Sequence, residues 1–137
     1  MKTFRAFLIL VLLLSANLMH AALRHDADTL IRPDKDQLGI QLIQLRDSMD
    51  LTLKSIEKNL GKNAAIINQQ LDKDFKDLKS YRQDVDRAIE KVAVVDDETW
   101  SIDIQNDLIN TLNDKRNDYR RILEDLKQVL VARNFRS

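Results

Sequence analysis

The sequence contains no cysteine, one proline and two glycines among its 137 residues. Without cysteine it has no disulfide framework. With so few turn-forming residues it does not suit a sandwich, a barrel or a nucleotide-binding α/β fold. Phosphate-binding glycine loops and cysteine zinc sites are excluded for the same reason. Aromatic residues make up only 5% of the chain, and beyond residue 22 most of them fall on or beside the apolar stripes described below. Stacking of bases or sugars is therefore not expected.

An excess of charge of either sign is also missing, because 22 basic residues are balanced by 22 acidic ones. If Lys2 and Arg5 are removed with a cleaved leader, 20 basic and 22 acidic residues remain, a formal charge of −2. No basic surplus is then available to attract nucleic acid or anionic lipid, and we expect no nucleic-acid partner. What the chain does have, 32% charged and 44% hydrophobic residues, is typical of long helices. The sequence therefore predicts an all-α protein.

Residues 1–22 have the three parts of a secretory signal peptide. Lys2 and Arg5 precede an unbroken apolar run over residues 6–14, and small residues follow, ending in the pair Ala21-Ala22. The apolar run covers about half of the ~20 residues that a membrane span needs. We expect the protein to be secreted and extracellular, with cleavage after Ala21 or after Ala22.

Beyond residue 33, apolar residues recur at intervals of three and four, the spacing that lines one face of a helix. The first stripe comprises Leu38, Leu42, Leu45, Met49, Leu53, Ile56 and Leu60. The second comprises Leu60, Ala64, Ile67, Leu71, Leu78, Tyr81, Val85, Ala88, Val92 and Val95, with Phe75 beside it. The third comprises Trp100, Ile104, Leu108, Leu112, Tyr119, Ile122, Leu126 and Val129. These stripes predict helices over about 34–60, 63–95 and 97–133, preceded by a flexible arm over 23–33 and followed by a tail over 134–137.

Local signals refine these bounds. Asp34 and Gln37 have the spacing of a capping box at the start of the first helix. One aspartate of Asp96-Asp97-Glu98 is expected to cap the third helix, with Glu98 in its first turn. Ion pairs along single helices are predicted for Asp50/Lys54, Asp72/Lys76, Lys73/Asp77 and Glu124/Lys127.

Gly61 decides between two architectures. A glycine can end a helix in the left-handed conformation, and the apolar register slips by one residue beside it. A break there predicts an elongated antiparallel three-helix bundle held by coiled-coil-like packing. A helix that continues through Gly61 predicts instead a long helical hairpin, whose uncovered apolar stripe a second copy would bury.

Catalytic and metal-binding signatures are missing from the mature chain. Its one histidine, His25, lies in the predicted flexible arm, where nothing can hold it against a serine with the precision that nucleophilic catalysis needs. Asp72, Asp74 and Asp77 lack the glycine and closing glutamate of a calcium loop. If cleavage follows Ala22, the new amino terminus and His25 could form a square-planar Cu(II) site. Apart from this weak possibility we assign no catalytic, cofactor or metal site, and expect no enzyme activity.

Two functions remain. The first is a secreted interaction protein that binds a protein partner or forms a homodimer. Four polar residues on or next to the predicted seam are compatible with setting the register of such an assembly, although placement on the surface explains them equally well: Thr52, Asn59, Asp74 and Lys115. The alternative is an extracellular carrier or lipid-associated protein, whose amphipathic helices would bury a hydrophobic ligand or lie on lipid.

Overall fold

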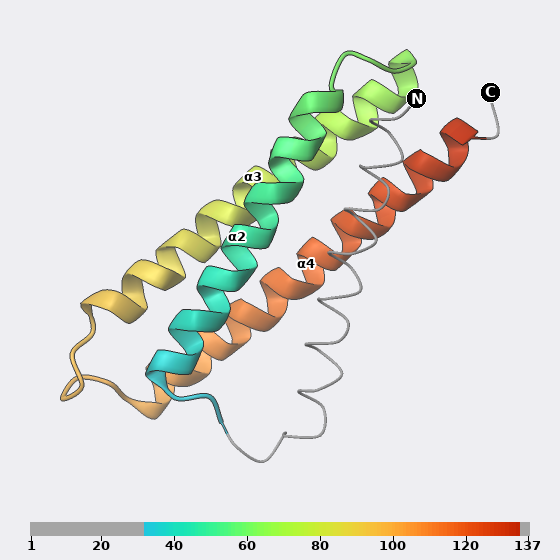
Figure 1. The fold of residues 1–137 in the computed structure, drawn as a ribbon. Coiled ribbons are helices and arrows are strands. Elements are labelled where there is room, and N and C mark those ends of the chain that lie inside the picture. Colours follow the sequence, from blue (N-terminus) through green and yellow to red (C-terminus); the bar gives the residue numbers. More distant parts are fainter. Residues whose placement is uncertain (1–31, 135–137) are drawn as a thin grey trace.

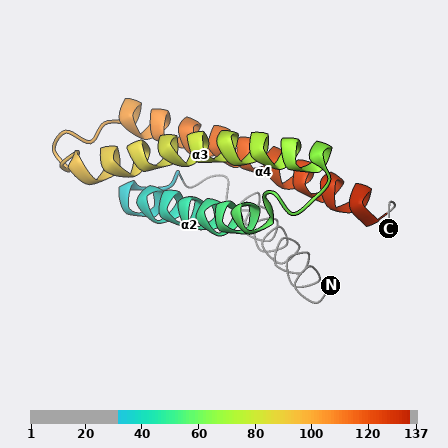
Figure 2. The ribbon, with the colours of Figure 1, turned by 90° about the horizontal axis from the view of Figure 1, so that it is seen from above.

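A computed structural model describes residues 32–134, and within them the chain forms three helices (Figure 1). They are α2 (Lys35–Asn59), α3 (Ala65–Val94) and α4 (Ile102–Asn134). Helix α3 runs antiparallel to α2, and α4 returns parallel to α2, so the bundle is up, down, up (Figure 2). At 1.5 Å per residue the helices are about 38, 45 and 50 Å long. The prediction of an all-α three-helix bundle is confirmed.

The predicted capping box starts α2. The Asp34 carboxylate accepts a hydrogen bond from the Gln37 backbone N–H at 2.8 Å, and the Gln37 side chain accepts one from the Asp34 N–H at 3.1 Å. Two of the N–H groups at the helix start are thereby satisfied. This end of α2 is tied to the rest of the bundle, because the Gln105 side chain of α4 donates to the Pro33 carbonyl at 2.7 Å.

Helix α2 ends next to Gly61, whose φ of 77° lies in the left-handed region that favours glycine. Asparagine side chains hold the turn together. The Asn63 amide donates to the Asn59 carbonyl and the Asn68 amide to the Asn63 carbonyl, while Asn68 accepts from the Gly61 N–H at 3.2 Å. The alternative of one unbroken helix through Gly61 is therefore wrong.

The start of the third helix differs from its prediction, because α4 begins at Ile102 instead of residue 97. Asp96 accepts hydrogen bonds from the backbone N–H and the hydroxyl of Thr99, which closes a turn ahead of the helix. The cap is provided by Ser101, whose side chain accepts from the Ile104 N–H at 3.3 Å. Glu98 is therefore outside the first turn. Aspartate is favoured both in such turns and at helix caps, so its presence alone did not separate the two.

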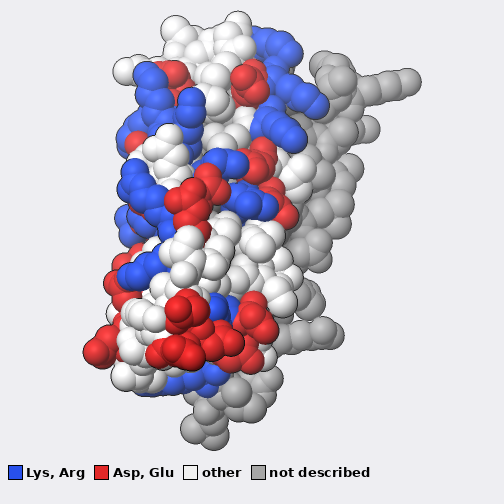
Figure 3. Space-filling model, turned by 90° about the vertical axis from the view of Figure 1, so that its left-hand side faces the viewer, with Lys and Arg blue, Asp and Glu red and all other residues white. Residues whose placement is uncertain are grey.

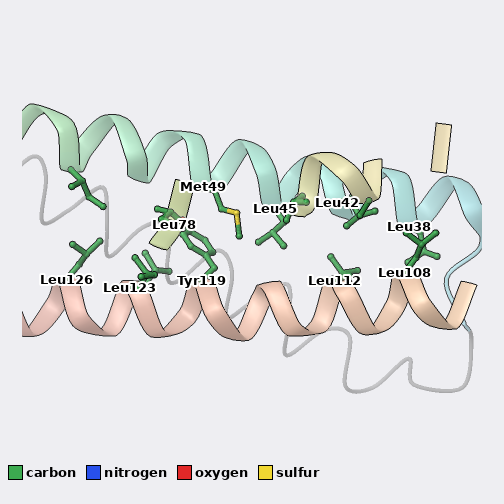
Figure 4. Close-up of a cluster of buried hydrophobic side chains, with 14 of the residues drawn as sticks. Leu38, Leu42, Leu45, Met49, Leu78, Leu108, Leu112, Tyr119, Leu123 and Leu126 are labelled. Atoms are coloured by element: carbon green, nitrogen blue, oxygen red, sulfur yellow. The ribbon is translucent and has the colours of Figure 1, made fainter. Parts of the chain in front are cut away.

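The core runs along the whole bundle axis between the three helices. Figure 4 shows Leu38, Leu42 and Met49 of α2 facing Leu108, Leu112 and Tyr119 of α4, with Leu78 of α3 beside them. The buried apolar residues all come from the predicted stripes, apart from Leu123 and Leu130. These two widen the buried face of α4 near its end. Packing of this face, more than helix propensity, is what stabilises such long helices.

Candidate functional site

Two polar groups at the centre of the bundle join α2 to α4. Thr52 and Tyr119 are 0% and 1% exposed, and their hydroxyl oxygens lie 2.7 Å apart. The Tyr119 hydroxyl donates to the Ser48 carbonyl at 3.0 Å, so its only proton is used there and Thr52 must donate to Tyr119. Burial raises the pKa of Tyr119 to about 12. The pair fixes the axial position of α4 against α2.

Asp74 is the one buried carboxylate among the described residues, with 1% of its surface exposed. One oxygen accepts a hydrogen bond from Gln70 at 2.9 Å, and the other has no hydrogen-bond partner in the described part of the chain. Burial raises the pKa of Asp74 to about 6, the Gln70 hydrogen bond lowers it, and the negative charge of Asp125 on α4 raises it further. Because an unpaired buried charge is costly, Asp74 weakens the bundle when it is ionised.

Lys115 lies between α3 and α4 and binds acidic groups on both. Its ammonium lies 3.0 Å from Asp84 of α3 and 3.3 Å from Asp118 of α4. It also lies over the Tyr81 ring, 5.0 Å from the centroid. Burial lowers the pKa of Lys115, but the two carboxylates outweigh this effect and the pKa is raised. Arg82 makes the corresponding link between α3 and α2, with its guanidinium 2.7 Å from Asp50.

The four predicted seam residues therefore have different roles. Thr52 and Lys115 join helices, and Asp74 is buried beside α4. Asn59 bonds within its own helix and the turn that follows, because its amide donates to the Ser55 carbonyl at 2.8 Å and its carbonyl accepts from the Asn63 amide. All four act within one bundle, so they give no evidence of an assembly of several chains.

The outer surface of the bundle carries charges of both signs along its length (Figure 3). Acidic side chains gather near the end that holds the connection between α3 and α4, where Asp96, Asp97 and Glu98 are exposed. Elsewhere on this face, basic and acidic side chains alternate. No extended field of one sign marks this face as a site for a strongly charged partner.

Exposed large apolar side chains are distributed unevenly. Four of the seven in the described residues lie at or near helix ends, one at each end of α3 and of α4. The other three lie in the body of α2: Ile40, Ile43 and Leu51, which are 56%, 39% and 45% exposed. Single exposed apolar residues are ordinary, but three on one helical face mark a candidate contact surface.

These three residues belong to a row of exposed positions on the side of α2 opposite the core. We call it the α2 outer row, and it comprises Asp36, Ile40, Ile43, Asp47, Leu51, Lys54 and Lys58. Its start is acidic, its end is basic and its middle is mainly apolar. These positions have helical spacing in the sequence, but the apolar stripes predict only the core face, so the row was not predicted.

The charges at the ends of the α2 outer row form no ion pair within the described bundle, although Asp36 and Lys58 lie where the dipole of α2 favours their charges. Among residues 32–134, Asp36, Lys54 and Lys58 make no ion pair, and the predicted pair of Lys54 with Asp50 does not form because Asp50 binds Arg82. Asp47 is the exception, since Arg46 binds it at 2.9 Å. The row is thus an exposed surface on which a bound partner could cover the apolar residues and form ion pairs with the charged ones.

Several expectations concern residues that the structure does not describe. The signal peptide over 1–22, the arm up to residue 31, the Cu(II) site at His25 and the tail beyond 134 lie outside the described residues. Over residues 32–134, acidic and histidine side chains do not come together in threes as a metal site requires. Within the same range, none of the helices has the length and hydropathy of a membrane span.

Comparison of the chain with protein-family models, with curated proteins and with solved structures finds no match.

Proposed function

We propose that this protein is secreted and acts, without catalysing a reaction, by binding another protein or further copies of itself. The observation that carries the proposal is the α2 outer row, an exposed apolar surface whose terminal charges find no partner in the described bundle. Its apolar centre can release water on contact, and its charged ends can orient the bound partner. The leader-like pattern of residues 1–22 supports the extracellular location.

The α2 outer row also favours a protein over a lipid as the ligand. A helix that lies on an anionic membrane usually combines a wide apolar face with lysine and arginine at its borders. Here two aspartates, Asp36 and Asp47, stand in the same row as the isoleucines. Anionic headgroups would repel these carboxylates, and this repulsion offsets the attraction of Lys54 and Lys58 at the other end of the row. We therefore do not expect the secreted protein to carry lipid, and the experiment below would detect lipid if it did.

The test is expression of the full chain in animal cells, with native and denaturing mass spectrometry of the medium. We expect the secreted protein to lack residues 1–21 or 1–22. After it is concentrated, we expect it to carry a protein partner or a second copy of itself. Retention of the chain inside the cells with residues 1–22 still attached would refute secretion. A monomer that carries lipid mass would overturn the interaction hypothesis in favour of the carrier.

A further inference from the structure

The spacing of the α2 outer row is symmetric about Asp47. From Asp36 the row advances by four, three and four residues to Asp47, and from there by four, three and four residues to Lys58. Two copies of α2 placed antiparallel, with Asp47 on the axis between them, would bring every position of one row opposite a position of the other. Such an arrangement is the isologous contact that a two-fold symmetric dimer requires.

The residues brought together in this way match in chemistry. Asp36 of one copy would face Lys58 of the other, and this pairing of opposite charges would occur twice. Ile43 would face Leu51, also twice, which joins the apolar centres of the two rows. Ile40 would lie against Lys54, whose methylene groups can cover an apolar side chain while its ammonium stays in water.

Only the central position is unfavourable, because Asp47 would approach its own copy. Each of these carboxylates is already bound by Arg46 of the same helix, so the repulsion between them is reduced. A parallel arrangement is worse, since it would set Asp36 against Asp36 and Lys58 against Lys58. Like charges across an interface disfavour that pairing and select the antiparallel one.

We propose that the α2 outer row binds a second copy of this chain, with the two α2 helices antiparallel about a two-fold axis at Asp47. This inference rests on the proposed function and names the partner. A single helix face is smaller than the ~800 Å² per subunit of a standard interface. The dimer should therefore be weak, with a Kd of about 10 μM to 1 mM, and it should form and dissociate rapidly.

The experiment is sedimentation of the mature secreted chain from about 10 μM to about 1 mM at low salt, a range that spans the expected Kd. We expect the weight-average mass to rise from the monomer value toward the dimer value across this range. Asp36→Lys and Lys58→Asp should each weaken the dimer by about tenfold, because each change turns two attractive pairs into repulsive ones. The double variant Asp36→Lys/Lys58→Asp restores opposite charges and should return to within about threefold of the wild-type Kd.

A second pair of variants tests the apolar centre. Ile43→Lys should abolish dimerisation in this concentration range, since it places charge at both Ile43–Leu51 contacts. Ile66→Lys changes an equally apolar residue on α3 that is more exposed and lies outside the row, and it should leave the Kd unchanged. Far-UV circular dichroism of each variant establishes that the bundle is folded.

A chain that remains monomeric at about 1 mM would overturn the proposal. So would a dimer that tolerates Ile43→Lys, or one that the double charge exchange fails to restore. None of these results alone refutes the proposed function, because that function also allows a different protein partner. It fails if the chain is retained in the cell, if it is secreted with lipid in place of a protein partner, or if it is secreted with neither a protein partner nor a second copy. A secreted monomer bound to a different protein would support the proposed function and refute self-association.

Discussion

Asp74 gives the sharpest test of how the bundle is held together. Its carboxylate is buried beside α4 with one oxygen unpaired, and its pKa of about 6 lies well above the usual 3.8. The folded state therefore binds a proton more readily than the unfolded state does. A carboxyl whose pKa is raised by folding destabilises the folded state when it is ionised. This destabilisation is complete well above the pKa of the folded state, and it disappears as the pH falls toward the pKa of the unfolded state.

The magnitude follows from the two pKa values. Each unit of difference corresponds to 1.36 kcal/mol, so ionised Asp74 costs the bundle about 3 kcal/mol. About 2 kcal/mol of that penalty should disappear between pH ~7.5 and pH ~4. Asp74→Asn removes the ionisation and keeps the shape. The difference in unfolding free energy between variant and wild type should therefore shift by about 2 kcal/mol over this range, in favour of the wild type as the pH falls.

Urea unfolding followed by far-UV circular dichroism at several pH values measures this difference. Asp72→Asn is the matched control, because Asp72 lies two residues away on α3 with its side chain 50% exposed. Its ion pair with Lys76 is exposed, so we expect a change of no more than about 1 kcal/mol at either pH. If the Asp74→Asn and wild-type stabilities stay parallel to within about 0.5 kcal/mol, Asp74 is not a costly buried charge and our reasoning is wrong.

Three further predictions concern stability and use the same urea assay. Gly39→Ala should stabilise the protein by about 1 kcal/mol, because the added Cβ only reaches ordinary contact with Val92 at 3.5 Å and alanine favours a helix; a loss of stability would refute this. Gly61→Ala should destabilise it by about 1 kcal/mol, since φ is positive there; an unchanged midpoint would contradict the left-handed conformation assigned to residue 61. Tyr119→Phe should cost about 1–2 kcal/mol by removing the buried acceptor of Thr52, and Thr52→Val added to it should recover part of the loss; strictly additive losses would argue against the pair.

The fold was predictable because its determinants are local. Helical spacing of leucine identified the buried faces, and Asp34, Gln37 and Gly61 supplied boundary signals that the structure uses. Asp96 shows the limit of such signals. Its side chain satisfies backbone groups in a turn as readily as at a helix cap, and only the path of the chain between α3 and α4 decides which occurs.

Interactions between helices were less predictable, since they depend on how each helix is rotated and shifted against its neighbours. Asp50 has Lys54 one turn away in sequence, yet it binds Arg82 on α3. Tyr119 was recognised as a core residue, but not as the partner of Thr52. The α2 outer row was visible in the sequence, although its significance depends on knowing that the opposite face is already covered by α3 and α4.

The odd number of helices in the described chain has a mechanical consequence. Helix α2 begins at one end of the bundle and α4 finishes at the other (Figure 1). A pulling force on these two points acts along the long axis and slides the helices past one another, instead of peeling one from the next. In sliding, the layers of the interior bear the load together. A molecule tethered at both points would therefore resist extension through the packing contacts between its helices.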